Sequence, residues 1–345
     1  MKFITIIAAA GTAALAVAAP TKRAVKLKLQ FWGINESGAE FGQQSLPGLY
    51  NKDYTWYDLN AIDTLIARGM NIFRLNLQLE RMAQGSLSAP LDKYYLGNLT
   101  AQVNHITSRG ATAHIAPHNY GRYNNAVITD AAAFKTFWTN LARPFASNPR
   151  VMFDTDNEFH DMDQNLVVRL NQAAIDGIRA AGATTQYITP EGNAWSGAWS
   201  WTSRPDSTTG LTNGQTMGKL KDPSNKLIYQ MHQYLDADSS GTSTTCVNST
   251  IFLNRLQDAT GWLRANGKKG IIGEFAGGNN ADCLSALKGG LDFLTKNTDV
   301  WTGAMWWAAG PWWGNYIFNM EPTSGTDMYT QVLPQLEAVV TVRDR

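Results

Sequence analysis

The feature that most constrains this chain is an alternation of short apolar segments with segments of helical periodicity along most of its 345 residues. Eight apolar segments have the length of strands: residues 29–34, 72–75, 111–117, 151–153, 187–189, 227–231, 270–273 and 301–307. Segments with helical spacing of apolar residues follow most of them: residues 55–68, 94–109, 130–145, 164–181, 252–266, 284–295 and 329–340. Strands that are joined through helices pair in parallel within one sheet.

Eight strand–helix units favour a closed barrel over an open doubly wound sheet. A nucleotide-binding open sheet would carry a G-x-G-x-x-G turn after its first strand, and no such turn follows residues 29–34. No linker rich in Pro, Ser or Thr divides the chain, and no internal repeat is visible. We therefore predict one α/β domain, a single (β/α)8 TIM barrel, over residues 24–345.

The low charge density limits the classes of partner. Lys and Arg (29) nearly balance Asp and Glu (28), and no strong basic cluster suggests nucleic-acid binding. Charged residues make up 17% and apolar residues 44% of the chain, which excludes intrinsic disorder. The 12 Trp residues, several of them in Gly-rich stretches, either fill a large core or offer flat surfaces for sugar rings. We expect a monomer that binds neither nucleic acid nor a membrane.

The N-terminal residues predict export. Residues 1–18 combine Lys2, an apolar run too short to span a bilayer, and a small-residue cleavage pattern, as in a secretory signal peptide. Residues 19–23 end in the dibasic pair Lys22-Arg23, so a second cleavage there would start the mature chain at Ala24. We expect a secreted, extracellular protein.

If the protein is exported, its two cysteines can form a disulfide and its sequons can be glycosylated. In an oxidising compartment, Cys246 and Cys283 favour one disulfide over two free thiols. The sequons at Asn98 and Asn248 have surface character and are candidate glycosylation sites. A third sequon, at Asn35, follows an apolar strand, so we expect it to be buried and unmodified.

Polar and aromatic residues close six of the predicted strands. Catalytic groups of such barrels lie at the carboxyl ends of the strands, where they share one mouth. The residues in these positions are Arg74, His118, Asn157 with Glu158, His232 with Tyr234, Glu274, and Trp306 with Trp307. Two carboxylates on separate strands, without a His or Cys motif for a metal, suit glycosidic bond cleavage through a general acid and a nucleophile. We expect no metal and no cofactor.

These strand ends resemble glycoside hydrolase family 5, and within it the secreted fungal endo-β-1,4-glucanases. The resemblance extends over essentially the whole mature chain. It rests on residues 35–42 (NESGAEFG), 73–74 (FR), 117–123 (PHNYGRY), 157–158 (NE), 231–234 (MHQY), 273–277 (GEFAG) and 306–313 (WWAAGPWW).

The resemblance implies retaining cleavage of β-1,4-glucan by double displacement, with cellulose and cello-oligosaccharides as substrates. It assigns Glu158 as the general acid/base and Glu274 as the nucleophile. Arg74 and Tyr234 would then hold Glu274 ionised and oriented.

The remaining implied contacts involve the substrate. Asn157 would bond the sugar 2-hydroxyl, His232 would hydrogen-bond near Glu158, and His118 would bind substrate. Trp307, rather than Trp306, would be the platform beside the scissile bond. From the residues alone, Trp195 or Trp199 in the loop after residues 187–189 is a second candidate platform, because small neighbours leave the indoles accessible.

Two departures from the family pattern bear on the site. Phe159 follows Glu158 where many relatives have Pro, and Asp156 stands where an uncharged Asn is expected. We expect Asp156 to be structural; if it faced the mouth instead, its charge would raise the pKa of Glu158. The alternatives to a glucanase are a β-mannanase or other β-1,4-glycanase on the same barrel, and a non-catalytic carbohydrate-binding protein.

Overall fold

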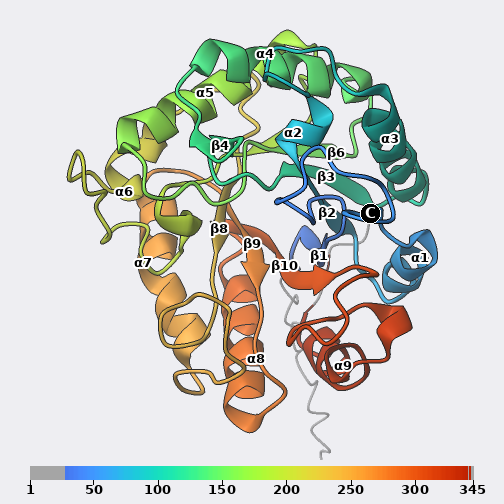
Figure 1. The fold of residues 1–345 in the computed structure, drawn as a ribbon. Helices are drawn as coiled ribbons and strands as arrows, with labels where there is room; N and C mark the ends of the chain where they lie inside the picture. Colours follow the sequence, from blue (N-terminus) through green and yellow to red (C-terminus); the bar gives the residue numbers. More distant parts are fainter. Residues whose placement is uncertain (1–27, 341, 343–345) are drawn as a thin grey trace, which may run out of the picture.

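The computed structural model describes residues 28–340 and 342 as a barrel of eight parallel strands surrounded by helices (Figure 1). The expected signal peptide (1–18), propeptide (19–23) and mature start at Ala24 lie outside these residues. The barrel strands are β1 (Phe31–Glu36), β2 (Ile72–Leu77), β3 (Thr112–Pro117), β6 (Val151–Asp154), β7 (Tyr187–Thr189), β8 (Tyr229–His232), β9 (Gly270–Phe275) and β10 (Trp301–Ala309).

The sheet is closed by its two terminal strands. Its order is β7-β6-β3-β2-β1-β10-β9-β8, and every pair in it is parallel. Parallel bridges Ile188–Leu227 and Glu191–Gln230 then join the β7 end of the sheet to the β8 end. The predicted (β/α)8 barrel is confirmed, with a strand at each of the eight predicted positions.

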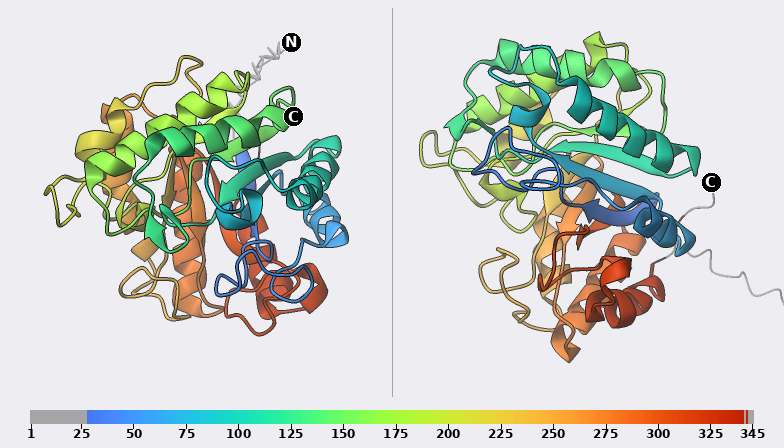
Figure 2. Two further views of the ribbon diagram at one scale, coloured as in Figure 1. Left: turned by 45° about the horizontal axis from the view of Figure 1, so that its top comes forward. Right: turned by 45° about the vertical axis from the view of Figure 1, so that its right-hand side comes forward.

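Helices form the outer layer (Figures 1 and 2). They are α1 (Leu59–Ala67), α2 (Leu79–Met82), α3 (Lys93–Ser108), α4 (Ala131–Ala142), α5 (Gln164–Ala180), α6 (Asn213–Thr216), α7 (Ile251–Ala265), α8 (Ala281–Lys296) and α9 (Leu333–Glu337). A short hairpin, β4 (Arg122–Tyr123) with β5 (Ala126–Val127), follows β3. Among the described residues, no helix is both long and apolar enough to cross a membrane.

Two predicted helices end differently in the structure. The predicted helix 130–145 is α-helical only to Ala142 and continues as a 3-10 turn, Arg143–Phe145, that contains Pro144. The predicted helix 329–340 consists of a π-helical turn, Met328–Val332, followed by the short α9. Pro144 and Pro334 explain both differences, because proline lacks the N–H that a continuing α-helix would use.

The interior of the barrel is apolar near the start of the strands. One cluster of buried side chains contains a residue from each of five strands and the residue just before β8: Phe31, Ile72, Met152, Ile271, Met305 and Ile228. The larger core lies between the sheet and the helices. Polar side chains farther along the same strands therefore lie above an apolar floor.

A disulfide fixes the long loop after β8. Cys246 in this loop bonds to Cys283 in the first turn of α8, with 5.3 Å between the Cα atoms. The chain thus contains the pairing that an even cysteine count favours. The same loop carries Tyr234 and Ser240 to the mouth of the barrel.

Candidate active site

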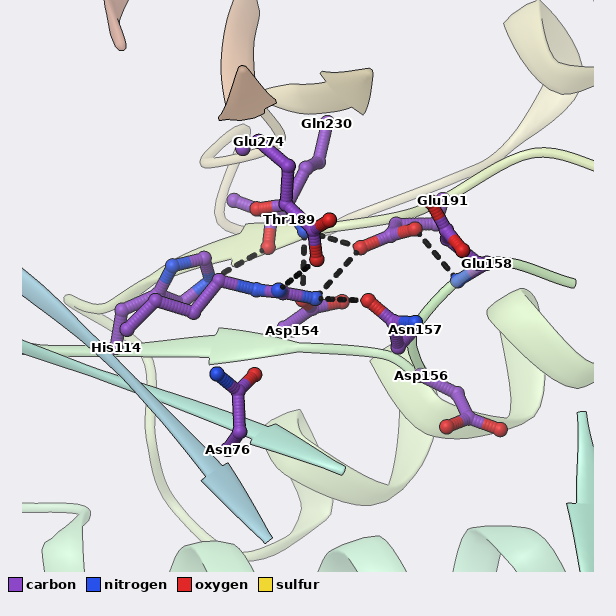
Figure 3. Close-up of polar contacts among 12 residues, drawn as sticks. Asn76, His114, Asp154, Asp156, Asn157, Glu158, Thr189, Glu191, Gln230 and Glu274 are labelled. Atoms are coloured by element: carbon purple, nitrogen blue, oxygen red, sulfur yellow. Dashed lines mark hydrogen bonds and ion pairs between the residues drawn. The ribbon is translucent and has the colours of Figure 1, made fainter. Parts of the chain in front are cut away.

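A buried arginine on β2 organises the polar end of the barrel. The guanidinium of Arg74 is fully buried and bonds to five side chains. Its Nε donates to Asp154 (2.8 Å), Nη1 to Asn35 and Glu274 (2.8 Å each), and Nη2 to Asn157 (2.7 Å) and Glu191 (3.1 Å). Figure 3 shows the acceptors arriving from several strand ends. Because a buried carboxylate needs a partner of opposite charge, one arginine stabilises three carboxylates here.

Glu158 and Glu274 face each other across His232. His232 Nδ1 lies 2.7 Å from Glu158 Oε1 and 3.5 Å from Glu274 Oε2. The Tyr234 hydroxyl donates to Glu274 Oε2 at 2.7 Å, and Arg74 holds the other oxygen of Glu274. One carboxylate oxygen of each glutamate and one His232 nitrogen all lie within 4.8 Å of one another.

The environments of these groups separate their protonation states. Burial, with the nearby Glu274, raises the pKa of Glu158 to about 7 although the bond to His232 opposes the rise. Burial alone would lower the pKa of His232, but the Glu191 and Glu274 carboxylates raise it well above its usual value. Arg74 and Tyr234 both donate to Glu274. The site therefore places a carboxyl of raised pKa, Glu158, beside a carboxyl bound by two donors, Glu274.

The backbone presents Glu158 to the mouth in an unusual conformation. Glu158 has a φ of +50°, in the left-handed region that non-glycine residues seldom occupy. Its N–H donates to Glu191 Oε2 at 2.7 Å, and the N–H of Asn157 donates to the carbonyl of Pro117 at 2.9 Å. A conformation of this kind costs about 1–3 kcal/mol and persists only where neighbouring bonds hold it.

Asp156 is occupied by the backbone of the loop after β3. Its carboxylate accepts the N–H groups of Asn119 (3.1 Å) and Gly121 (2.8 Å), and in Figure 3 it points away from Asn157 and Glu158. The geometry fits the structural alternative for Asp156. Phe159, the other departure from the family pattern, is fully buried, and its carbonyl accepts the N–H of Trp195 at 3.1 Å.

An open cleft crosses the mouth and divides at Glu158. A cavity of about 600 Å³ on one side includes Glu158, Glu274, His118, Tyr234, Trp307 and Trp313 in its lining. A cavity of about 630 Å³ on the other side includes Glu158, His160, Trp195, Trp199, Arg204 and His232. The first continues into a smaller one, about 280 Å³, past Trp307 and Trp313 to Phe41. The three cavities share lining residues, so together they form one cleft that extends on both sides of Glu158.

Comparisons with known proteins agree with this geometry. Residues 34–310 match the model of the family described as Cellulase (glycosyl hydrolase family 5). Endoglucanase gh5-1 of Neurospora crassa is 56% identical over 299 residues, 87% of this chain and 74% of that protein. Endo-beta-1,4-glucanase A of Emericella nidulans is 53% identical over 321 residues, 92% of this chain and 94% of that protein. A solved structure of XacCel5A in complex with cellopentaose superposes with a TM-score of 0.85 at 36% identity, covering 90% of this chain and 99% of that one.

The chain belongs to the cellulase family, glycosyl hydrolase family 5. Its family motifs all converge on the cleft. The sequence-predicted residues that line it are His118, Glu158, Trp195, Trp199, His232, Tyr234, Glu274 and Trp307. Arg74 and Asn157 lie just beneath, joined by a hydrogen bond.

The tryptophans of this cellulase-family site differ in accessibility. Trp307 lines the cleft and stacks on His118, with 5.2 Å between ring centroids, whereas Trp306 is fully buried and donates to the Phe318 carbonyl. Trp195 and Trp199 are both 37% exposed. His160 stacks on Trp195 at 4.6 Å, and Arg255 lies over Trp199 at 5.1 Å from the ring centroid.

Several residues of the site escaped sequence reasoning. Asp154, Glu191 and Gln230 are fully buried and join Arg74 in one network, and Asn35 bonds to the carbonyls of Gly273 and Trp306. Glu191 lies two residues beyond the predicted strand 187–189, and Asp154 directly follows the predicted strand 151–153. A strand-end position was therefore the available signal for both carboxylates. Gln230 lies inside a predicted strand and offered only its polarity.

Three groups of the site, Glu158, His232 and Glu274, are of the types that bind metal ions. Glu158, His232 and Glu274 form the set of ligand atoms found within 4.8 Å among the described residues. Their atoms already serve hydrogen bonds, and both Arg74 and a protonated His232 would repel a cation. The donor set therefore favours a hydrogen-bonded acid–base centre over a metal centre.

Proposed function

We propose that this cellulase-family chain is an endo-acting, retaining β-1,4-glucanase of cellulose and cello-oligosaccharides. One observation carries the proposal: Glu158 and a Glu274 that accepts two hydrogen bonds face each other in an open cleft, with one oxygen of each within 4.8 Å. Retaining enzymes place their carboxyl groups about 5–5.5 Å apart, whereas inverting enzymes leave about 6.5–9.5 Å for a water. The short separation supports retention.

The two carboxyls would act in sequence. Glu274 attacks the anomeric carbon while Glu158 gives its proton to the departing glycosidic oxygen, which leaves a glycosyl-enzyme ester on Glu274. Glu158, now ionised, removes a proton from water, and that water displaces Glu274 from the anomeric carbon. Glu158 ends protonated again, so the cycle closes without a cofactor.

The position of the acid orients the substrate in the cleft. The leaving group must depart on the side of Glu158, so the cavity with Trp195, Trp199 and Arg204 takes the reducing-end sugars. The cavity with Glu274, His118 and Trp307 takes the sugar that becomes covalently bound. Because the cleft is open on both sides of the scissile bond, cleavage is internal to the chain.

The buried polar groups suit the sugar hydroxyls. Asn157 gives its carbonyl oxygen to Arg74, while its Nδ2 is buried without a partner among the described residues. A 2-hydroxyl of the bound sugar would accept that N–H. His118 also has an unpartnered Nδ1 within the described chain, and burial and Arg74 keep its pKa well below the usual value, so neutral His118 can bond a hydroxyl.

The proposal extends to the biology of a secreted enzyme. Export through the signal peptide would bring the sequons at Asn98 and Asn248 to the glycosylation machinery; Asn248 is exposed and Asn98 is partly exposed. Asn35 of the third sequon is fully buried and bonded to two carbonyls. Mass spectrometry of the secreted protein tests cleavage before Ala24 and the occupancy of both sites.

Product analysis tests the activity. We expect release of reducing ends from carboxymethylcellulose and barley β-glucan, little from mannan, and a first-formed product of β configuration by NMR. Preferred cleavage of mannan would support the mannanase alternative, and binding without cleavage would support the non-catalytic one. Glu274→Gln should abolish turnover while cello-oligosaccharide binding persists, and unchanged turnover would contradict the mechanism.

A further inference from the structure

Glu191 lies where the barrel closes. It follows β7 and forms the parallel bridge with Gln230 of β8 that joins the two ends of the sheet. Its side chain is fully buried, and its carbonyl accepts Asn171 Nδ2 of α5 at 2.9 Å. The backbone of Glu191 is therefore fixed from two sides.

Each carboxylate oxygen of Glu191 contacts a different part of the catalytic centre. Oε2 accepts the N–H of Glu158 at 2.7 Å. Oε1 accepts from Arg74 at 3.1 Å and from Gln230, and lies 3.4 Å from His232 Nε2. All of these neighbours are donors, and Arg74 and His232 also contact Glu274. Burial opposes the ionised form of Glu191, but His232 and Arg74 hold its pKa down at about 2.

The bond between the Glu158 N–H and Glu191 Oε2 supports a strained backbone. It binds the backbone of the acid/base itself, at a residue whose φ of +50° needs support. A small rotation of this backbone would swing the Glu158 carboxyl away from His232 and from the glycosidic oxygen. Asp154 provides a contrast: it is also buried and bonded to Arg74 and Gln230, but within the described chain it makes no hydrogen bond or ion pair with Glu158 or His232.

We propose that Glu191 is a positioning residue for proton transfer: its carboxylate fixes the backbone of Glu158 and the ring of His232, so that the Glu158 carboxyl points at the leaving group. The proposal rests on the proposed function, since it presumes that Glu158 is the acid. Glu191 does not touch the substrate; it acts through Glu158.

The charged and titratable groups around Glu191 are those that a substitution would disturb. Arg74 approaches from β2, His232 from β8 and Glu158 from the loop after β6, while Asp154 shares Arg74 and Gln230 with it. In Glu191→Gln the new NH2 group must face one of these donors, whichever way the amide is turned. The variant therefore breaks the contact with Glu158 or the contacts with Arg74 and His232.

Two substrates with different leaving groups distinguish a role of Glu191 in proton transfer from any other role. Cleavage of cellopentaose needs the proton of Glu158, whereas 2,4-dinitrophenyl β-cellobioside releases a phenolate that needs none, and kcat/KM reports this first step. We expect Glu191→Gln to lower kcat/KM for cellopentaose about 30-fold and for the dinitrophenyl substrate less than about threefold. A loss of about 30-fold is a part of the roughly 10²–10⁴-fold that general acid catalysis contributes, as expected when the acid is displaced but not removed. A loss that is equal on both substrates, or absent on both, would overturn the proposal.

Two further variants complete the experiment. Asp154→Asn is the matched control, because Asp154 bonds to Arg74 and lies beside Glu191 but makes no bond to Glu158 or His232 within the described chain. The variant disturbs Arg74 while the Glu191 carboxylate stays in place, and we expect equal losses on both substrates. Glu191→Asp keeps the charge but is one methylene too short to contact both the Glu158 N–H and the Arg74–His232 pair. We expect it to lower kcat/KM for cellopentaose more than for the dinitrophenyl substrate, by a smaller factor than Glu191→Gln does. It replaces Glu191→Gln in the test if that variant does not fold. Full activity of Glu191→Asp on cellopentaose would overturn the proposal.

Failure of this inference is distinguishable from failure of the proposed function. If the wild-type enzyme cleaves neither substrate, the glucanase proposal fails. If the wild type cleaves both and the Glu191 variants show no split, only the role of Glu191 fails. The dinitrophenyl rate itself reports that the variant active site is folded, and thermal unfolding gives a second check.

Discussion

The two ends of the barrel interior are lined by the same faces of the strands, but one end is apolar and the other is charged and hydrogen-bonded. Side chains two residues apart on a strand share a face, so Ile72 and Arg74 on β2 both point inward. The same step leads from Met152 to Asp154 on β6 and from Ile228, next to β8, to Gln230. The lower layer is an apolar cluster, and the layer above it is a hydrogen-bonded network around one arginine.

Gly273 shows how the upper layer is accommodated. A Cβ at this position would come within 2.4 Å of the Gln230 side chain. The absence of a side chain therefore lets Gln230 reach Asp154 and Glu191. The difference between the layers indicates that the lower one stabilises the fold. The upper one holds charges in a defined arrangement, and the burial of these charges costs free energy of folding.

Removal of the central cation should give the largest effect. Arg74→Met leaves Asp154, Glu191 and Glu274 without their shared partner, and breaking a buried pair costs about 3–5 kcal/mol. We expect that loss in urea unfolding at neutral pH, together with at least about 10³-fold lower kcat/KM on cellopentaose. A fully active variant would show that the upper layer does not depend on Arg74.

Truncation in the lower layer should separate stability from chemistry. Ile72→Ala removes a fully buried side chain two residues from Arg74 and should lower the free energy of unfolding by about 2–5 kcal/mol. Well below its melting temperature the variant should keep kcat/KM within about twofold of the wild type. A much larger loss of activity in the folded variant would mean that the two layers are mechanically coupled.

The pH dependence of kcat/KM should report the proton of Glu158. Burial raises the pKa of Glu158 to about 7, so Glu158 carries its proton below that pH and loses it above. The value of kcat/KM should therefore fall about tenfold per pH unit on the alkaline side. Asp156→Asn should leave this alkaline limb in place, since Asp156 binds the N–H groups of Asn119 and Gly121. A shift of the limb to lower pH would instead assign Asp156 an electrostatic role.

The smallest expected effects lie at the rim of the cleft. Trp199→Ala should raise KM for cellopentaose about three- to tenfold with little change in kcat, from lost contact worth ~1 kcal/mol. Trp195→Ala should change KM less than about twofold, because His160 stacks on that indole and Arg204 lies over it as well, whereas among the described residues Arg255 is the cation over Trp199. The reverse order would identify Trp195 as the platform for the leaving sugars.

Much of the fold could be predicted because barrel strands and their helices are local patterns. All eight strands lie where apolar runs predict them. Helix boundaries differ where proline interrupts a helix, at Pro144 and Pro334, and where an N-cap sets the first turn, at Asp58 and Asn280. The cleft residues were accessible for a related reason: a strand end is a sequence position, and parallel closure brings all such positions to one mouth.

The buried network was predictable only in part. Arg74 and Glu274 stand 200 residues apart, yet their side chains bond at 2.8 Å. Apart from their strand-end positions, Glu191 and Asp154 carry no pattern that distinguishes them from capping or surface carboxylates. Arg74 reaches both from β2 across the barrel interior, and Gln230 meets Glu191 because the ends of the sheet close.

The sequence by itself determined the strand–helix alternation, the inward-facing positions and the chemical identity of the groups at the strand ends, because all three depend on local periodicity and composition. The tertiary structure alone decided which carboxyl keeps a proton, which one Arg74 and Tyr234 bind, and which one supports the backbone of Glu158. The physical reason is that the pKa and orientation of a buried group depend on charges and donors close in space, and here these come from strands far apart in the chain.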